Sequence, residues 1–204
     1  MKKTAIVLTF IISIIGYAAN LHAGTAKGSG ETVVDCSKEP IPDGSVEVSI
    51  NGVAFKPTVV KLRKGGGLSS DGVKLDKFTL EFKNEDDMFA RLSAEVSFLV
   101  PKGKNPDGKT FRRLPDTTPF PKVSTVKQPA AAEGLPEVQT WEMQDRDSGL
   151  KISSSFNGPG SLRIELGKRT GKTITGKIHI CVPPGPDAGD KMSSVSGAFQ
   201  AVLE

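Results

Sequence analysis

The fold class follows most directly from residues 88–100, whose sequence is MFARLSAEVSFLV. Apolar side chains occupy every second position of this stretch, and most positions between them are polar. The apolar set is Met88, Ala90, Leu92, Ala94, Val96, Phe98 and Val100, and the polar set is Arg91, Ser93, Glu95 and Ser97. Because successive side chains of a strand point to opposite faces, this alternation predicts a half-buried antiparallel strand.

The same period-two pattern recurs along the chain. Residues 78–82 predict a partner strand, joined to 88–100 by the polar turn Asn84-Glu85-Asp86-Asp87. Further strands are expected at 45–50, 53–62, 150–156, 162–166, 173–182 and 195–203, and Pro57 marks a bulge or an edge in the second of these. No segment has a convincing helical period. The sequence therefore predicts an all-β fold of about eight to nine strands, either an antiparallel two-sheet sandwich or a flattened barrel.

The first 23 residues have the pattern of a secretory signal peptide. Lys2 and Lys3 precede an apolar run over residues 5–17, and small residues follow at Ala18, Ala19 and Ala23. We expect cleavage after Ala23, with Ala18 as the alternative, and a single β domain over residues 24–204. The protein is then exported to the periplasm or secreted. No transmembrane segment is expected after cleavage, because no later segment approaches 18 consecutive apolar residues.

Removal of the signal peptide changes the charge and the histidine count. The chain has 27 basic and 23 acidic residues, and two lysines leave, so the net charge becomes 25 − 23 = +2. His22 also leaves, which makes His179 the only histidine of the mature chain. Sites that need several histidines are therefore excluded, and we predict no metal and no cofactor.

The two cysteines, Cys36 and Cys181, predict one disulfide, since the count is even and the expected compartment is oxidising. It would close a loop of 181 − 36 = 145 residues. The chain-entropy model assigns such a closure roughly 4–5 kcal/mol as an upper figure. The alternative is a reactive or metal-binding pair. Neither a CxxC motif nor a histidine beside Cys36 in the sequence supports that alternative.

Residues 101–137 interrupt the alternation and predict a long, basic, Pro-rich loop insertion, with seven of the fourteen prolines. Within 102–127, seven basic residues outnumber Asp107 and Asp116, giving 7 − 2 = +5. The insertion is either a solvated connector or a contact surface for an anionic protein, glycan or envelope component. For the contact surface we single out Lys109, Phe111, Arg112, Arg113 and Lys122, with Phe111 and Phe120 as the candidate exposed aromatics. Nucleic acid is not expected as a partner of an exported protein.

Three other features have structural interpretations. Residues 103–110 match the phosphate-loop pattern GxxxxGK[ST], but that site needs a helix from Lys109, which the prolines at 115, 119 and 121 prevent. We interpret the stretch as a polar, turn-forming loop. The acidic turns at 85–87 and 145–149 lack the spaced ligands of a calcium loop. Trp141, the only tryptophan, is interpreted as a core residue.

These observations predict an exported, non-catalytic binding or assembly module of the cell envelope or extracellular space. The alternative is a secreted hydrolase that uses His179 or clustered carboxylates. His179 shares the polar face of its strand with Lys177 and Cys181, and we interpret it as a surface or disulfide-neighbouring histidine. A hydrolase should instead have a concave cleft in which His179 or two acids converge.

Overall fold

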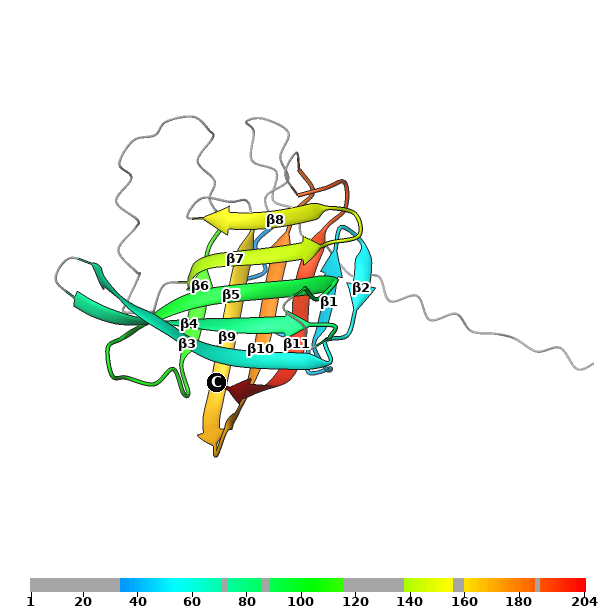
Figure 1. Ribbon diagram of the computed structural model, residues 1–204. Coiled ribbons are helices and arrows are strands. Elements are labelled where there is room, and N and C mark those ends of the chain that lie inside the picture. Colours follow the sequence, from blue (N-terminus) through cyan, green and yellow to red (C-terminus); the bar gives the residue numbers. More distant parts are fainter. Residues whose placement is uncertain (1–33, 71–72, 86–88, 116–137, 156–159, 186–187) are drawn as a thin grey trace, which may run out of the picture.

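In the computed structural model, the chain is described over residues 34–70, 73–85, 89–115, 138–155, 160–185 and 188–204. These residues form strands and no helix (Figure 1). The strands are β1 (Glu47–Ile50), β2 (Val53–Phe55), β3 (Val59–Ser70), β4 (Val73–Lys83), β5 (Leu92–Pro101), β6 (Thr110–Arg113), β7 (Val138–Asp145), β8 (Leu150–Ser155), β9 (Ser161–Thr170), β10 (Thr173–Val182) and β11 (Ser193–Leu203). Within the same ranges, no helix could span a membrane.

All the strands belong to one curled sheet, in the order β6-β9-β10-β11-β3-β4-β5-β7-β8. β1 pairs with both β11 and β2 beside this path. Figure 1 shows that the sheet bends back over itself, so that β3, β4, β5, β7 and β8 cross in front of β6, β9, β10 and β11. We call these groups the front half and the back half, and count β1 and β2 with the back half.

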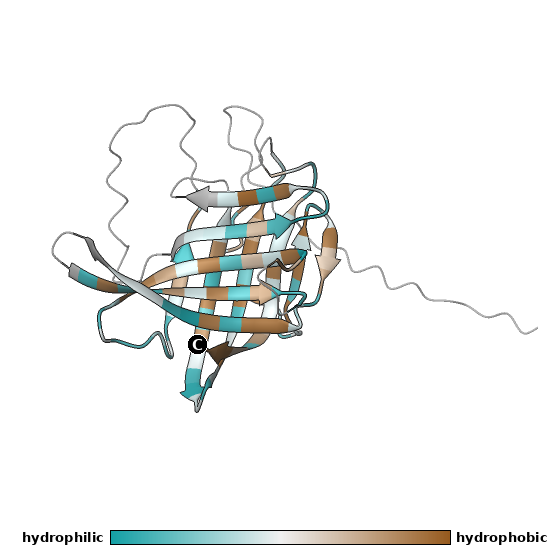
Figure 2. Cartoon of the chain, in the orientation of Figure 1, coloured by the Kyte–Doolittle hydropathy of each residue, from teal (hydrophilic) through white to brown (hydrophobic). Residues whose placement is uncertain are grey.

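The core lies between the two halves. The Phe98 ring on β5 packs against the Phe111 ring on β6, with centroids 4.2 Å apart. Phe82 on β4 meets Phe199 on β11 in an edge-to-face contact at 5.5 Å. Trp141 is 2% exposed, which confirms its predicted core position. Hydrophobic and hydrophilic residues alternate along many of the strands (Figure 2), because one side faces this core and the other faces solvent.

The predicted hairpin at 78–100 is present as the antiparallel pair β4 and β5, in which Leu80 lies opposite Val96. The expected strand at 53–62 is instead two strands, β2 and β3, and Pro57 lies in the break between them. A proline cannot donate a hydrogen bond to a sheet ladder, which accounts for an interruption at this point.

The sheet is mixed, so the prediction of an antiparallel two-sheet sandwich is wrong in its finer detail. β11 and β3 are parallel, with Val202 opposite Lys61 and Leu203 opposite Leu62. The cause is a chain reversal at Asn51 and Gly52, whose φ angles of 48° and 83° suit a tight hairpin turn. β1 runs antiparallel to β11, so after one reversal β2 and the following β3 run in the direction of β11.

The predicted insertion at 101–137 is described only in part. Pro101 is the last residue of β5, residues 110–113 form β6, and β7 begins at Val138. β6 pairs with β9 and is therefore part of the sheet, which corrects the expectation of a loop at these positions. The strand is four residues long, too short for an alternating pattern to stand out. Residues 116–137 lie outside the described residues.

We predict that Phe98→Ala lowers the free energy of unfolding by about 3–5 kcal/mol, because it removes a fully buried ring from the contact between the halves. Leu99→Ala is the matched control, since Leu99 lies on the opposite face of β5 and is half-buried. Its expected loss is below about 1.5 kcal/mol. Chemical denaturation of both variants provides the measurement, and equal losses would contradict the assignment of the core face.

Candidate functional site

The outer face of the back half carries a continuous polar row. The strand register aligns Arg112 on β6, Arg163 on β9, His179 on β10, Ser196 on β11 and Glu47 on β1. Each of these side chains points outward because its neighbours along the strand, such as Ile178 and Ile180 beside His179, fill the core. Cross-strand neighbours on one face have Cβ atoms roughly 5 Å apart, so adjacent members of the row can interact.

Residues 34–45, which we call the N-terminal strap, lie against this face. The Cys36 N–H donates to Ser161 Oγ on β9 at 2.8 Å, and Asp43 forms an ion pair with Lys177 on β10. Farther along, the Gly44 carbonyl accepts from the Ala198 N–H on β11 at 2.7 Å. The strap is therefore attached to three strands of the back half before the chain enters β1.

The predicted Cys36–Cys181 disulfide is present and joins the strap to β10. The Cα atoms are 6.0 Å apart, within the usual range for a disulfide. Cys36 is fully buried and Cys181 is 5% exposed. A disulfide of this kind is compatible with an oxidising, exported location.

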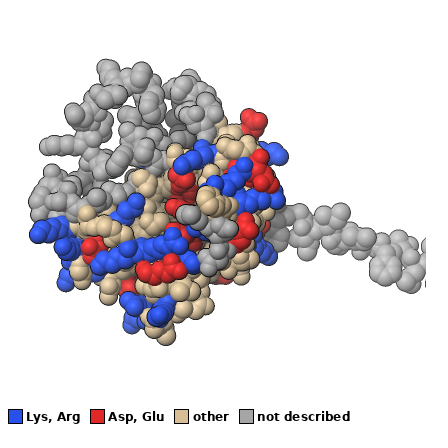
Figure 3. Space-filling view, in the orientation of Figure 1, with Lys and Arg blue, Asp and Glu red and all other residues tan. Residues whose placement is uncertain are grey.

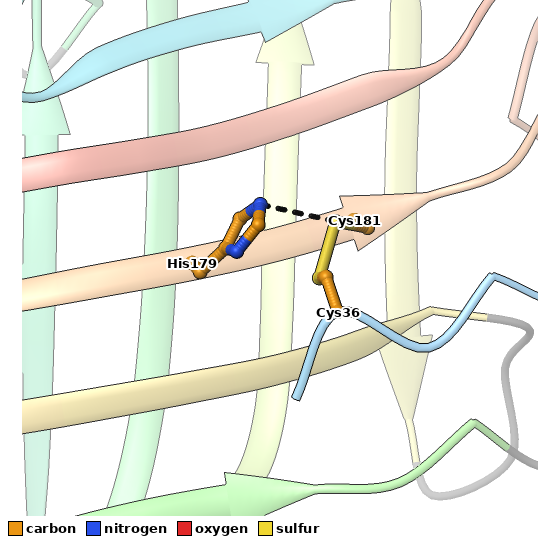
Figure 4. Close-up of side chains that lie close together, drawn as sticks. All are labelled: Cys36, His179 and Cys181. Carbon is orange, nitrogen blue, oxygen red and sulfur yellow. Dashed lines mark hydrogen bonds between the residues drawn. A yellow bond between two sulfur atoms is a disulfide. The ribbon is translucent and has the colours of Figure 1, made fainter. Parts of the chain in front are cut away.

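His179 lies against this disulfide, as the sequence suggested. Figure 4 shows its ring directed at Cys181, with Nε2 3.4 Å from Cys181 Sγ. Burial lowers the pKa of His179, and the negative charge of Glu39 on the strap partly opposes that shift. The imidazole is therefore neutral at pH 7. Its Nδ1 atom is buried and has no hydrogen-bond partner among the residues that the structure describes.

The structure separates the residues that the sequence grouped as a binding surface. Phe111 is fully buried in the core, so its predicted exposure is wrong. Arg112 is exposed in the polar row, where it lies directly opposite Arg163. Lys109 and Arg113 are half-buried. Lys122 and Phe120 lie outside the described residues.

Lysine and arginine side chains gather instead at one end of the molecule, formed by residues 64–70 with 73–77, residues 101–110 and residues 167–172. We call this surface the basic end. Hydrogen bonds connect its segments: the Lys102 N–H donates to the Lys74 carbonyl at 2.9 Å, and the Gly108 N–H donates to the Gly167 carbonyl at 3.0 Å. The basic residues are Lys64, Lys74, Lys77, Lys102, Lys104, Lys109, Lys168, Arg169 and Lys172. Asp76 and Asp107 are the acidic ones among these described residues, so their net charge is 9 − 2 = +7.

Sequence reasoning found only the middle segment of the basic end. The other two segments belong to the β3–β4 and β9–β10 hairpins, each of which is far from residues 101–110 in the chain. Their lysines look like ordinary turn residues in isolation. In the sequence, the basic residues at 168–172 are the one visible sign of this surface. They lie beside residues 101–110 only because β6 pairs with β9, which the sequence pattern does not indicate.

The phosphate-loop pattern at 103–110 has no phosphate-loop structure. Gly103 and Gly108 have φ angles of 76° and 68°, typical of turns, and the chain continues into the strand β6 from Thr110. The Gly103 N–H donates to the Asp76 carboxylate at 3.0 Å. This confirms the interpretation of the stretch as a turn-forming loop.

A row of carboxylates lies on the outer face of the front half, where Glu81, Glu95 and Glu142 are cross-strand neighbours. Cations surround the row: Arg63 lies 2.8 Å from Glu81, and Lys151 lies 3.0 Å from Glu142. Burial, and next the charge of Glu81, raise the pKa of Glu95. The row lies across three neighbouring strands of the sheet and contains no histidine.

A groove of about 330 Å³ lies on the back half, between the strap, β1 and β11. Its lining residues are Pro42, Gly44, Ser45, Glu47, Ser49, Ser194, Ser196 and Gly197. Glu47 is the one carboxylate in this set, and His179 is not part of it. The groove therefore lacks the convergence of His179 or two acids that the hydrolase alternative requires.

No family model, curated protein or solved structure matches this chain.

We predict that neither cysteine of the purified protein reacts with an alkylating agent under denaturing, non-reducing conditions, whereas both react after reduction. Denaturation is needed because buried thiols also escape alkylation in the folded state. Replacing both cysteines by serine should lower the free energy of unfolding by about 2–5 kcal/mol, since the strap loses its covalent connection to β10. Mass spectrometry and chemical denaturation test the two parts, and two reactive thiols before reduction would contradict the disulfide.

A second prediction concerns the effect of pH on stability. The folded-state pKa of His179 lies below its ordinary value of 6.5, so the unfolded chain binds more protons between the two values. Stability should therefore fall as the pH drops below about 6.5. His179→Gln should lose less stability than the wild type between pH 7.5 and 5.5. Asp43 and Glu204 also have lowered pKa values, but their protonation affects stability at lower pH and does so equally in the wild type and the variant. Parallel pH profiles in chemical denaturation would show that His179 is not responsible.

Proposed function

We propose that the protein is an exported, non-catalytic binding module that captures an anionic component of the cell envelope or extracellular space through its basic end. The observation that carries this proposal is a set of unpaired lysines brought together from three distant segments. Lys74, Lys77, Lys102, Lys104, Lys109, Lys168 and Lys172 form no ion pair with any described residue. Figure 3 includes basic side chains toward the left and lower edges of the molecule, in the region of the β3–β4 and β9–β10 hairpins.

Several cations of the front half are paired within the protein. On the front half, Lys61 and Arg63 contact Glu204 at 2.9 Å, and Lys83 lies 3.1 Å from Glu81. Those charges are neutralised within the protein. Among the described residues of the basic end, only Lys64 has such a partner, Asp76 at 2.8 Å, and the seven lysines named above remain available to a binding partner. Their combined field attracts an anion over roughly 8 Å at physiological ionic strength. Lysines spread over three loops suit a partner with repeated charges, such as an acidic glycan, better than one small ion.

The hydrolase alternative has weaker support. His179 faces a disulfide instead of a nucleophile, and its burial beneath the strap leaves little room for a substrate. The carboxylates of the front half are held among cations. A binding module does not require His179 or the front-half carboxylates to react. Binding through the basic end is therefore consistent with both observations.

Binding to an immobilised sulfated polysaccharide tests the proposal. We expect retention of the full chain at low salt and elution as the salt rises, because screening weakens exposed charge interactions. Lys104→Glu/Lys168→Glu should bind roughly tenfold more weakly, which corresponds to about 1.4 kcal/mol. Both side chains are exposed, so the free energy of unfolding should change by less than about 1 kcal/mol.

The matched control is Lys56→Glu/Lys191→Glu, which changes the net charge equally at exposed lysines outside the basic end. This variant should keep most of the wild-type affinity. An equal loss in both double variants would mean that total charge, and not the basic end, determines binding. Salt-independent retention would contradict an electrostatic site altogether.

A further inference from the structure

The disulfide and His179 bring three atoms of metal-binding type into one small cluster. The two cysteine sulfurs and an imidazole nitrogen all lie within 4.8 Å of one another. Figure 4 shows how they meet: His179 and Cys181 come from β10, and Cys36 comes from the strap. While the S–S bond is intact, the sulfurs cannot act as thiolate ligands. After reduction, the same three residues offer one imidazole and two thiols, which bind a metal as thiolates.

The strap has anchors other than the disulfide. The Cys36 N–H donates a hydrogen bond to Ser161 Oγ. The Ser161 hydroxyl in turn donates to the Val34 carbonyl oxygen at 3.2 Å. Asp43 pairs with Lys177 at the other end of the strap. These contacts hold Cys36 over β10 independently of the S–S bond. Reduction therefore does not by itself remove Cys36 from His179 and Cys181.

We propose that, in its reduced form, the cluster of Cys36, His179 and Cys181 is a binding site for Cu⁺. Soft thiolate ligands favour Cu⁺ and Zn²⁺ over harder cations, and imidazole suits both metals. Structural Zn²⁺ sites almost always have four protein ligands, whereas this cluster offers three. Cu⁺ is satisfied by lower coordination. The proposal does not rest on the basic end, which shares no residue with the cluster.

Opening the site requires a two-electron reductant, for which a dithiol is sufficient. One thiolate of the dithiol attacks a sulfur of the disulfide, the Cys36–Cys181 bond breaks, and the second thiolate resolves the mixed disulfide. The dithiol is oxidised to a disulfide, and two cysteine thiols are released. Cu⁺ then binds as both thiols lose their protons to solvent. The chain thus exchanges a covalent crosslink for a metal crosslink at the same place.

The surroundings of the cluster suit a bound Cu⁺ ion. Cys36 is fully buried and Cys181 nearly so. This burial makes reduction by the dithiol slow, and it equally limits the access of water and oxidants to the sulfurs once Cu⁺ is bound. Because burial lowers its pKa, His179 is neutral at pH 7 and has a nitrogen lone pair available. Two thiolates and Cu⁺ leave one negative charge. A cation lies beside the site in the polar row, since Arg163 is the cross-strand neighbour of His179, although Arg163 also forms an ion pair with Glu165.

Cu⁺ titration under anaerobic conditions tests the proposal. The full chain is reduced with dithiothreitol, freed of reductant by desalting, and titrated with Cu⁺ in competition with a chromophoric chelator. We expect one Cu⁺ per reduced chain and none in the oxidised protein. Zn²⁺, titrated in parallel, should bind at least about tenfold more weakly. Equal Cu⁺ uptake by the two redox forms, or a preference for Zn²⁺, would overturn the proposal.

Variants identify the ligands. His179→Gln keeps both thiols but should weaken Cu⁺ binding by about tenfold or more, and its X-ray absorption spectrum should lose the nitrogen contribution. Ser196→Ala is the matched control, because Ser196 lies opposite His179 on β11 and is not a ligand. It should bind Cu⁺ like the wild type. Circular dichroism follows the fold of the reduced chain. Wild-type affinity in His179→Gln, or Cu⁺ uptake only by a chain that has lost its sheet, would refute the site.

Discussion

Packing of the front half against the back half is the interaction on which the rest of the structure depends. Where the sheet bends, β11 and β3 share only two registered residue pairs, so backbone pairing contributes little to holding the halves together. Aromatic contacts supply the connection, with Phe98 against Phe111 and Phe82 against Phe199. The basic end depends on this packing as well. One of its hairpins, β3–β4, belongs to the front half, and the other, β9–β10, belongs to the back half.

The back half has a second level of organisation, because its outer face is partly covered by the strap. An exposed sheet face is ordinarily in contact with solvent, but here Cys36 and Asp43 bring main chain over β10. This cover explains why His179, which points away from the core, is nevertheless half-buried and has a lowered pKa. The polar row thus changes character along its length, from the exposed Arg112 to the sheltered His179.

Alternation predicted where most strands lie, because one buried face defines the period, but it underestimated the longest ones. β3 continues to Ser70 and β4 begins at Val73, beyond the expected ranges 53–62 and 78–82. The disulfide followed from the count of cysteines, and the position of His179 beside it followed from a spacing of two along one strand. Four features could not be predicted in this way. β6 is too short for a pattern, and Phe111 is buried although charged residues follow it. The parallel pairing of β11 with β3 depends on the reversal at Asn51-Gly52 and also on which strand β3 then lies beside, and alternation does not indicate that partner. The basic end exists only after distant segments have been paired.

The disulfide joins residues 145 apart, and β1 and β3 both pair with β11, the last strand of the described chain. Synthesis delivers the chain from the N-terminus, so Cys36 and these early strands appear long before their partners do. The topology therefore has a high contact order, and native pairing in the back half cannot be completed on a partly synthesised chain. Until β10 and β11 arrive, the edges of β1 and β3 and the thiol of Cys36 have no native partner. Folding of this protein is consequently a late event, and its incomplete chains are the ones most in need of protection from aggregation.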